Sequence, residues 1–167
     1  VVGQAIRGLS KRPIIATKCG LVWDERGNIS NRLKRESVRQ EAAASLRRLR
    51  VDVIDLYQIH WPVPDEDIEE AWREMSQLIK EGKVRYIGVS NFNVSQMKRI
   101  APIHPIASLQ PPYSILRRDV EKDVLPYCAE HNLGVVVYSP MQKGLLTGKV
   151  TRKWVESLPS DDHRRND

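Results

Sequence analysis

The sequence has few of the features that mark secreted, metal-binding or membrane-embedded proteins. Its only two cysteines, Cys19 and Cys128, lie far apart without a Cys-x-x-Cys spacing, so neither a disulfide framework nor a zinc site is expected. No run approaches the roughly 20 apolar residues of a membrane span. Residues 1–6 also lack the basic region, apolar run and cleavage site of a secretory signal. These absences favour a protein of the reducing cytoplasm.

The formal net charge of +6 is compatible with a nucleic-acid partner or with an anionic small ligand. Basic and acidic residues are mixed along most of the predicted helices, as in residues 35–41, and no RNA-binding, zinc-finger or basic-region pattern occurs. The one basic concentration, residues 47–50, falls in the last turn of a predicted helix, where cations suit the helix dipole. The distribution of charge argues against nucleic-acid binding.

Two kinds of segment alternate along the chain. Short apolar, β-branched segments are typical of buried parallel strands, and they are separated by segments with the apolar spacing of amphipathic helices. Strands are expected at residues 13–18, 53–59, 86–90, 106–110 and 134–138. Helices are expected around residues 38–49, 68–79, 94–100, 119–131 and 151–158, and the polar residues 160–167 are expected to fray.

Several helix ends have recognisable signals. Asp65 or Asp67 is available to cap the helix that begins near residue 68, and Asn93 is available to cap the next one. Gly82 follows the first of these helices and is expected in the left-handed conformation that often ends a helix.

The alternation predicts an α/β fold built from βαβ units. An open doubly wound sheet and a closed (β/α)₈ barrel of the TIM type both satisfy it. The absence of a G-x-G-x-x-G fingerprint after the first strand weakens the doubly wound, nucleotide-binding alternative. Residues 1–167 show no linker or strong repeat, so a single domain is expected.

Polar side chains follow each predicted strand. They are Lys18, His60, Ser90 with Asn91, Gln110 and Tyr138. In parallel α/β folds, functional residues gather at the carboxyl ends of strands. Each residue also has a structural explanation: Ser90 and Asn91 could cap a helix, Gln110 could satisfy backbone groups, and Tyr138 could lie in the core. The joint pattern, more than any single residue, predicts a site at this end of the sheet.

Four segments closely resemble the aldo-keto reductase superfamily, in its general bacterial branch. They are residues 15–18 (IATK), 52–62 (DVIDLYQIHWP), 81–92 (EGKVRYIGVSNF) and 138–149 (YSPMQKGLLTGK). The resemblance covers nearly the whole chain. It implies a (β/α)₈ barrel, present here as a partial barrel of about five parallel strands, and reduction of aldehydes or ketones with NADP(H).

The resemblance also implies roles for individual residues. Lys18 matches the lysine that lowers the pKa of a catalytic tyrosine, as an ammonium beside a phenol does, and His60 matches the histidine that orients the substrate carbonyl. Ser90, Asn91 and Gln110 match residues that hydrogen-bond the nicotinamide carboxamide, and Tyr138 matches the ring that stacks on it. Ser139, Gly144 and Leu145 fall in the loop that runs along the pyrophosphate.

The family's catalytic aspartate and tyrosine belong to a strand expected before Val1, and its eighth strand is expected after the last residue. We therefore expect a central fragment with impaired turnover, and Tyr113 is the only tyrosine worth testing as a substitute acid. The exposed barrel edges make a homo-oligomer possible. The alternative function is a non-catalytic, cofactor-sensing or interaction protein on the same scaffold.

Overall fold

The computed structural model describes residues 1–165 and shows a parallel five-stranded sheet. All neighbouring strands in it are parallel. In spatial order the strands are β1 (Ala16–Cys19), β4 (Ile54–Ile59), β5 (Val84–Ser90), β6 (Ser108–Gln110) and β7 (Gly134–Val135). The predicted five parallel strands are therefore present, and their spatial order follows their order in the chain.

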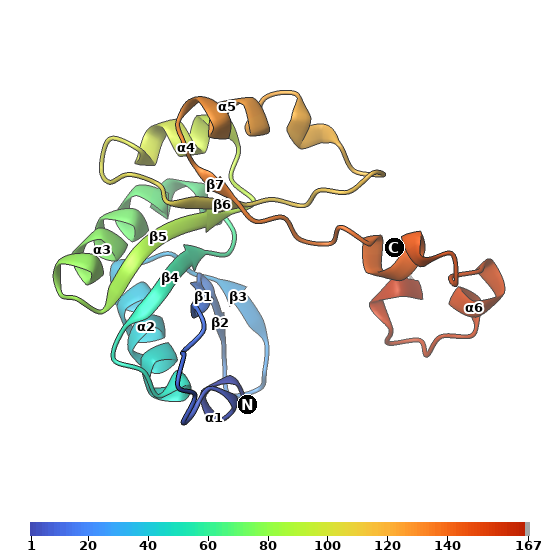
Figure 1. Cartoon of the computed structure of the whole chain (residues 1–167), viewed down its shortest axis with the longest axis horizontal. Coiled ribbons are helices and arrows are strands. Elements are labelled where there is room, and N and C mark those ends of the chain that lie inside the picture. The colour runs from blue at the N-terminus through green and yellow to red at the C-terminus, as the bar shows by residue number, and fades with distance from the viewer. Residues whose placement is uncertain (166–167) are drawn as a thin grey trace.

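The helices that connect these strands cover one face of the sheet (Figure 1). They are α2 (Arg35–Leu49), α3 (Ile68–Lys80), α4 (Val94–Ile100) and α5 (Val124–Glu130), and a short α1 (Val2–Ala5) packs on α2. Helices on one face of consecutive parallel strands are the arrangement found in an arc of a (β/α)₈ barrel.

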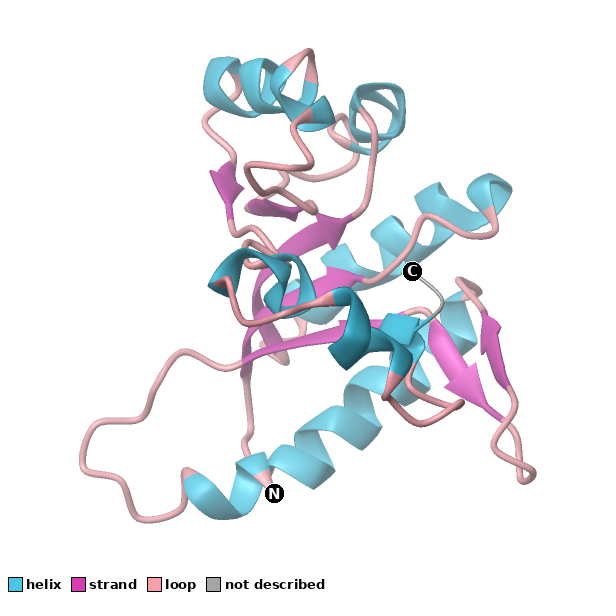
Figure 2. Ribbon diagram, turned by 90° about the vertical axis from the view of Figure 1, so that its right-hand side faces the viewer, coloured by secondary structure: helices cyan, strands magenta, loops and turns pink. Residues whose placement is uncertain are grey.

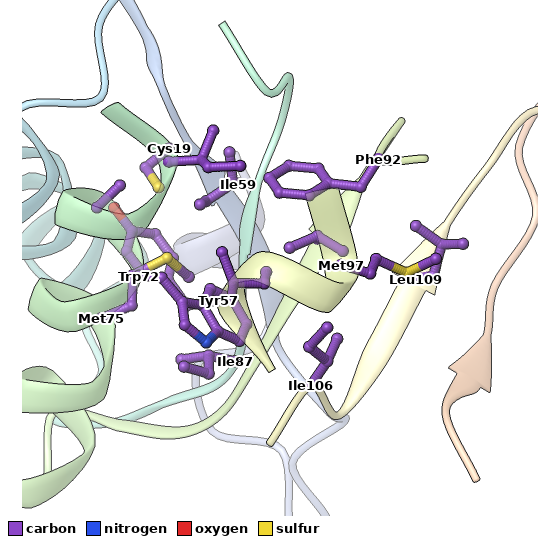
Figure 3. Close-up of a cluster of buried hydrophobic side chains, with 14 of the residues drawn as sticks. Cys19, Tyr57, Ile59, Trp72, Met75, Ile87, Phe92, Met97, Ile106 and Leu109 are labelled. Atoms are coloured by element: carbon purple, nitrogen blue, oxygen red, sulfur yellow. The ribbon is translucent and has the colours of Figure 1, made fainter. Parts of the chain in front are cut away.

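The hydrophobic core lies between the sheet and these helices (Figure 3). Strand residues Tyr57, Ile59 and Ile87 meet Trp72 and Met75 of α3, and all five are fully or almost fully buried. The polar atoms of the two large aromatic residues are satisfied, because Trp72 Nε1 donates to the His104 carbonyl at 3.0 Å and the Tyr57 hydroxyl donates to the Val38 carbonyl at 3.3 Å. Burial of each such side chain stabilises the fold by about 1.5–3 kcal/mol.

A β-hairpin that the sequence did not predict follows β1. Its strands β2 (Leu21–Trp23) and β3 (Ile29–Asn31) pair antiparallel. The turn between them is held by Asp24, whose Oδ1 accepts from the backbone N–H groups of Arg26 and Asn28 at 2.9 Å each. An aspartate that bonds its own turn, followed by glycine, is a known turn signal, so this hairpin could have been found.

The helix ends confirm two predictions and contradict one. Asn93 caps α4, since its side chain accepts from the N–H of Gln96, and Gly82 has a φ of 71° after α3. Neither Asp65 nor Asp67 caps α3. Asp67 instead pairs with Lys34 at 2.6 Å and Asp65 bonds Arg99 and Gln96, because cationic and amide partners on α4 and before α2 compete with the helix N-terminus.

Two predicted elements are shorter than expected. The helix predicted at 119–131 divides into a 3₁₀ helix, Asp119–Glu121, and α5. Pro126 lies in the first turn of α5, where its missing N–H is tolerated, whereas a continuous helix would bring its ring against the carbonyl four residues earlier. Residues 136–138 continue β7 through backbone bonds from Val136 to Leu109 and from Tyr138 to Pro111, and the Tyr138 carbonyl accepts from the N–H of Tyr113.

Residues 139–165 project from the side of the sheet that α2–α5 leave open, as Figures 1 and 2 show. They contain 3₁₀ helices at Gln142–Thr147 and His163–Arg165 around α6 (Arg152–Glu156). Another 3₁₀ helix, Asp65–Asp67, precedes α3. Thus part of the stretch expected to fray is ordered, and residues 166–167 lie outside the described part. Among the described residues, no helix is both long and apolar enough to cross a membrane.

Candidate active site

The carboxyl ends of the parallel strands bring four of the predicted residues to one edge of the sheet. Lys18 is in register with Gln58, which lies two residues before His60 in the chain. The backbone N–H of His60 donates to the Cys19 carbonyl at 2.9 Å. Ser90 is in register with Gln110 on the next pair of strands. A register that placed Lys18 and His60 at opposite ends would have removed the basis for a common site.

Burial affects both Lys18 and His60, and the charge of Lys18 also acts on His60. Partial burial lowers the pKa of the Lys18 ammonium. Partial burial, and then the positive charge of Lys18, lower the pKa of His60. Since an unperturbed histidine has a pKa of about 6.5, a lowered value keeps the imidazole neutral at pH 7. A neutral imidazole has one N–H donor and one acceptor nitrogen, so His60 is suited to donate a hydrogen bond to an uncharged carbonyl.

Asn91 joins the ends of four strands through its amide group. Its Nδ2 donates to the His60 carbonyl at 2.9 Å and to Ser90 Oγ at 3.1 Å, and its Oδ1 accepts from the Tyr138 hydroxyl at 2.8 Å. Its backbone N–H donates to the Gln110 carbonyl at 3.2 Å. Asn91 has a φ of 64°, a left-handed conformation that asparagine adopts more readily than most residues.

The capping alternative for Ser90 and Asn91 does not hold, because Asn93 caps the following helix. Ser90 Oγ instead donates to the Gln110 carbonyl at 2.8 Å. The two residues therefore connect the strand ends and leave their polar atoms at the edge of the sheet, beside Lys18 and His60.

Tyr138, Ser139 and Leu145 line a cavity of about 560 Å³ between the sheet and the projecting segment. The lining also includes the cationic side chains of Arg117, Lys143 and Arg164. Gly144 lies in the same loop with a φ of 99°, outside the cavity lining, and its N–H donates to the Met141 carbonyl at 3.0 Å.

The sequence analysis did not identify the cationic residues of this cavity. Arg164 lies over the ring of Trp154 at 5.1 Å and pairs with Asp162, in a stretch read only as a polar tail. Arg117 reaches the cavity from the loop after β6, which no spacing rule connects to residue 164. The described residues contain no group of three or more His, Cys, Asp and Glu side chains able to hold a metal ion.

Tyr113 is not available as a substitute acid. Its hydroxyl donates to Glu121 Oε1, and this hydrogen bond to a carboxylate raises the pKa of the phenol. Tyr57 is also not available as an acid, because it is buried in the core and its hydroxyl donates to a backbone carbonyl.

Comparison with known proteins agrees with this geometry. The chain is 40% identical over its whole length to the aldo-keto reductase YhdN of Bacillus subtilis, covering 50% of that protein. It is 39% identical to the NADH-specific methylglyoxal reductase of Escherichia coli, over 93% of this chain and 52% of that one. It therefore spans about half the length of these curated relatives.

A solved structure shows the same fold. The glycerol dehydrogenase AKR11B4 of Gluconobacter oxydans superposes with a TM-score of 0.91 at 42% identity, over 99% of this chain and 51% of that one. The family model for aldo/keto reductases matches residues 1–166. The five-stranded sheet with its flanking helices is thus part of a (β/α)₈ barrel, and the chain belongs to the aldo/keto reductase family.

Proposed function

We propose that this chain carries the substrate-polarising and nicotinamide-binding residues of an NADP(H)-dependent reductase that converts aldehydes or ketones to alcohols. The observation that supports this most directly is the position of Lys18 and His60 at one edge of the sheet, with the pKa of both lowered. A lysine and a histidine placed this way, next to the amide of Asn91, suit a reaction in which charge develops on a carbonyl oxygen.

The polar groups at this edge fit a nicotinamide ring. A carboxamide has both donors and acceptors, and the Ser90, Asn91 and Gln110 side chains offer both. The cavity beside Tyr138 contains cations that suit a pyrophosphate, because guanidinium and ammonium groups form strong hydrogen bonds to phosphate oxygens. The Asn91 amide is satisfied within the protein, so binding of a carboxamide there exchanges existing hydrogen bonds for new ones.

When bound, the reduced nicotinamide supplies a hydride to the carbonyl carbon. The chain's own residues act on the oxygen. The neutral imidazole of His60 donates a hydrogen bond to the carbonyl oxygen and orients it. The Lys18 ammonium stabilises the negative charge that develops on that oxygen. The proton that completes the alcohol would come from an acid beside Lys18, and the ammonium would lower the pKa of a phenol in that position.

The test is the oxidation of NADPH, and separately of NADH, by the chain in the presence of methylglyoxal. Where turnover is measured, His60→Asn and Lys18→Met are each expected to lower kcat/KM by about 100-fold or more, the usual contribution of a positioned acid, base or charge. Lys11→Met, at an exposed position, is the matched control. Turnover that survives both substitutions would contradict the assignment.

Binding separates this proposal from the non-catalytic alternative. Quenching of tryptophan fluorescence by NADPH measures binding without chemistry. Binding with no turnover of any aldehyde tested would favour a cofactor-sensing or interaction protein, and absence of both would contradict the nicotinamide site itself.

A further inference from the structure

Glu41, in the middle of α2, reaches the turn that follows β1. Its Oε2 accepts from the backbone N–H of Gly20 at 2.9 Å. The hydroxyl of Ser37, one helical turn earlier, donates to Oε1 at 3.0 Å. The turn after β1 and α2 therefore each supply a donor to the same carboxylate.

The turn held by Glu41 determines where β1 ends. Gly20 has a φ of 93°, and a Cβ at this position would lie 2.8 Å from the Leu33 side chain, so the backbone conformation excludes other residues. Lys18 lies only two residues before this glycine. The Cys19 carbonyl between them accepts from the N–H of His60. A displacement of the turn would therefore move Lys18 relative to His60.

Among the described residues, no other side chain anchors the Lys18 ammonium. Within residues 1–165 no hydrogen bond or ion pair to its ammonium is found, and burial without a partner lowers its pKa. The direction of the side chain is consequently set by the backbone that carries it. Lys18 and Glu41 line the same cavity of about 240 Å³, together with Trp23, Ser45 and Arg48.

Two opposing effects act on the pKa of the Glu41 carboxylate. Partial burial raises the pKa of Glu41, and the hydrogen bonds from Gly20 and Ser37 and the charge of Arg48 act in the opposite direction. A neutral side chain could hold a turn without desolvating a charge. A partly buried carboxylate bonded to this particular turn therefore indicates a requirement for a strong and directional restraint.

We propose that Glu41 is a positioning residue for Lys18. By fixing Gly20, its carboxylate keeps the Lys18 ammonium beside His60 at the edge of the sheet. The catalytic consequence rests on the proposed function, whereas the geometric claim can be tested without cofactor or substrate.

The titration of His60 reports the position of Lys18, because the Lys18 charge lowers the pKa of the imidazole. The other charged or titratable groups of this region are Glu41 and Arg48 on α2 and the buried Cys19 and Tyr57 on the sheet. Direct loss of the Glu41 charge would lower the pKa of His60, since a negative charge favours an imidazolium. Displacement of Lys18 would raise it. The sign of the change separates the two effects.

The experiment is an NMR titration of the histidine ring protons in the intact chain, with the His60 signal assigned by its loss in His60→Asn. Glu41→Ala is expected to raise the pKa of His60, and Glu41→Gln to raise it less, because glutamine keeps one acceptor oxygen. Glu36→Gln, an exposed carboxylate on the same helix, is expected to leave it unchanged. Circular dichroism establishes that each variant is folded, and Glu41→Gln serves if Glu41→Ala does not fold.

A pKa of His60 that is unchanged or lower in a folded Glu41 variant would overturn the proposal. In the turnover assay, a lower kcat with an unchanged KM for NADPH is expected for Glu41→Gln. If the wild-type chain shows no turnover but the His60 titration shifts upward, the proposed function fails and the positioning role stands. Turnover unaffected by Glu41→Gln, together with an unshifted titration, would remove the positioning role alone.

Discussion

The two ends of the sheet differ in how their charged side chains are partnered. At the amino end, the buried carboxylate of Asp55 accepts from the N–H of Ile15 at 2.8 Å and pairs with Arg12 and Arg85 at 2.9 and 3.2 Å. At the carboxyl end, the cationic Lys18 lies close enough to His60 to lower its pKa, and neither has a carboxylate partner among the described residues.

This difference separates residues that stabilise the fold from residues that are available for chemistry. Opposite charges that satisfy one another at the amino end hold β1, β4 and β5 together. Burial disfavours the charged forms of Lys18 and His60, and the charge of Lys18 adds to this at His60. Perturbed groups of this kind weaken the fold and cluster where a ligand or reaction uses them. In (β/α)₈ barrels the same division is general, with catalysis at the carboxyl ends of the strands.

The largest effect is expected from breaking the amino end. Asp55→Ala leaves two arginines and the Ile15 N–H without their acceptor, and should lower the free energy of unfolding by about 2–3 kcal/mol, less than for fully buried partners because both arginines are partly exposed. Urea denaturation measures this change. Asp52→Ala, an exposed carboxylate three residues earlier, is the control, and an equal effect there would refute a special role for Asp55.

A smaller loss of stability is expected at the carboxyl end. Asn91→Ala removes three side-chain hydrogen bonds and places alanine in a left-handed conformation, for a loss of about 2 kcal/mol. Asn91→Gly removes the same bonds without the conformational strain and should recover about 1 kcal/mol of it. If the two variants are equally stable in urea, the left-handed backbone of residue 91 contributes nothing measurable.

The pH dependence of stability should differ between the ends. His60 has a lowered pKa when folded, so the unfolded chain binds more protons as the pH falls below about 6.5, and this favours unfolding. His60→Asn should therefore weaken the loss of stability between pH 7 and pH 5, measured as the change in urea midpoint. His104→Asn, in the loop between α4 and β6, is the comparison; an identical slope in both variants would contradict the role of His60.

The smallest expected effect is a gain in stability. The pKa of Lys18 is lowered when folded, so the charged folded form is disfavoured throughout the range below that pKa, including pH 7. Lys18→Met removes this penalty and should raise the urea midpoint slightly while it removes activity. A lower midpoint would show that the ammonium has a stabilising partner.

Part of this arrangement follows from the sequence for a simple physical reason. Parallel strands of similar length, connected by helices, align their carboxyl ends, so the residue that ends each strand is brought to a common edge without any knowledge of distances. Lys18, His60, Ser90 and Gln110 were found this way, and the geometry places them together.

What could not be predicted depends on contacts between distant segments. The hydrogen-bond partners of the Asn91 side chain lie up to 47 residues away in the chain, and the target of Glu41 lies 21 residues away. The capping assignment at Asp67 was wrong for the same reason, because Lys34 competes for its carboxylate. The role proposed for Glu41 required the position of a helix relative to a turn, which no local spacing contains.

The spatial order of the strands has a consequence for assembly. Within the described residues, β1 and β7 are the two outermost strands, and each has one row of backbone N–H and C=O groups facing away from the sheet. Lys18 belongs to one of these strands and Tyr138 follows the other. A further strand, from this chain or from another molecule, that paired with either outer strand would lie beside Lys18 or close to Tyr138. Association at these strands would therefore affect residues of the proposed site.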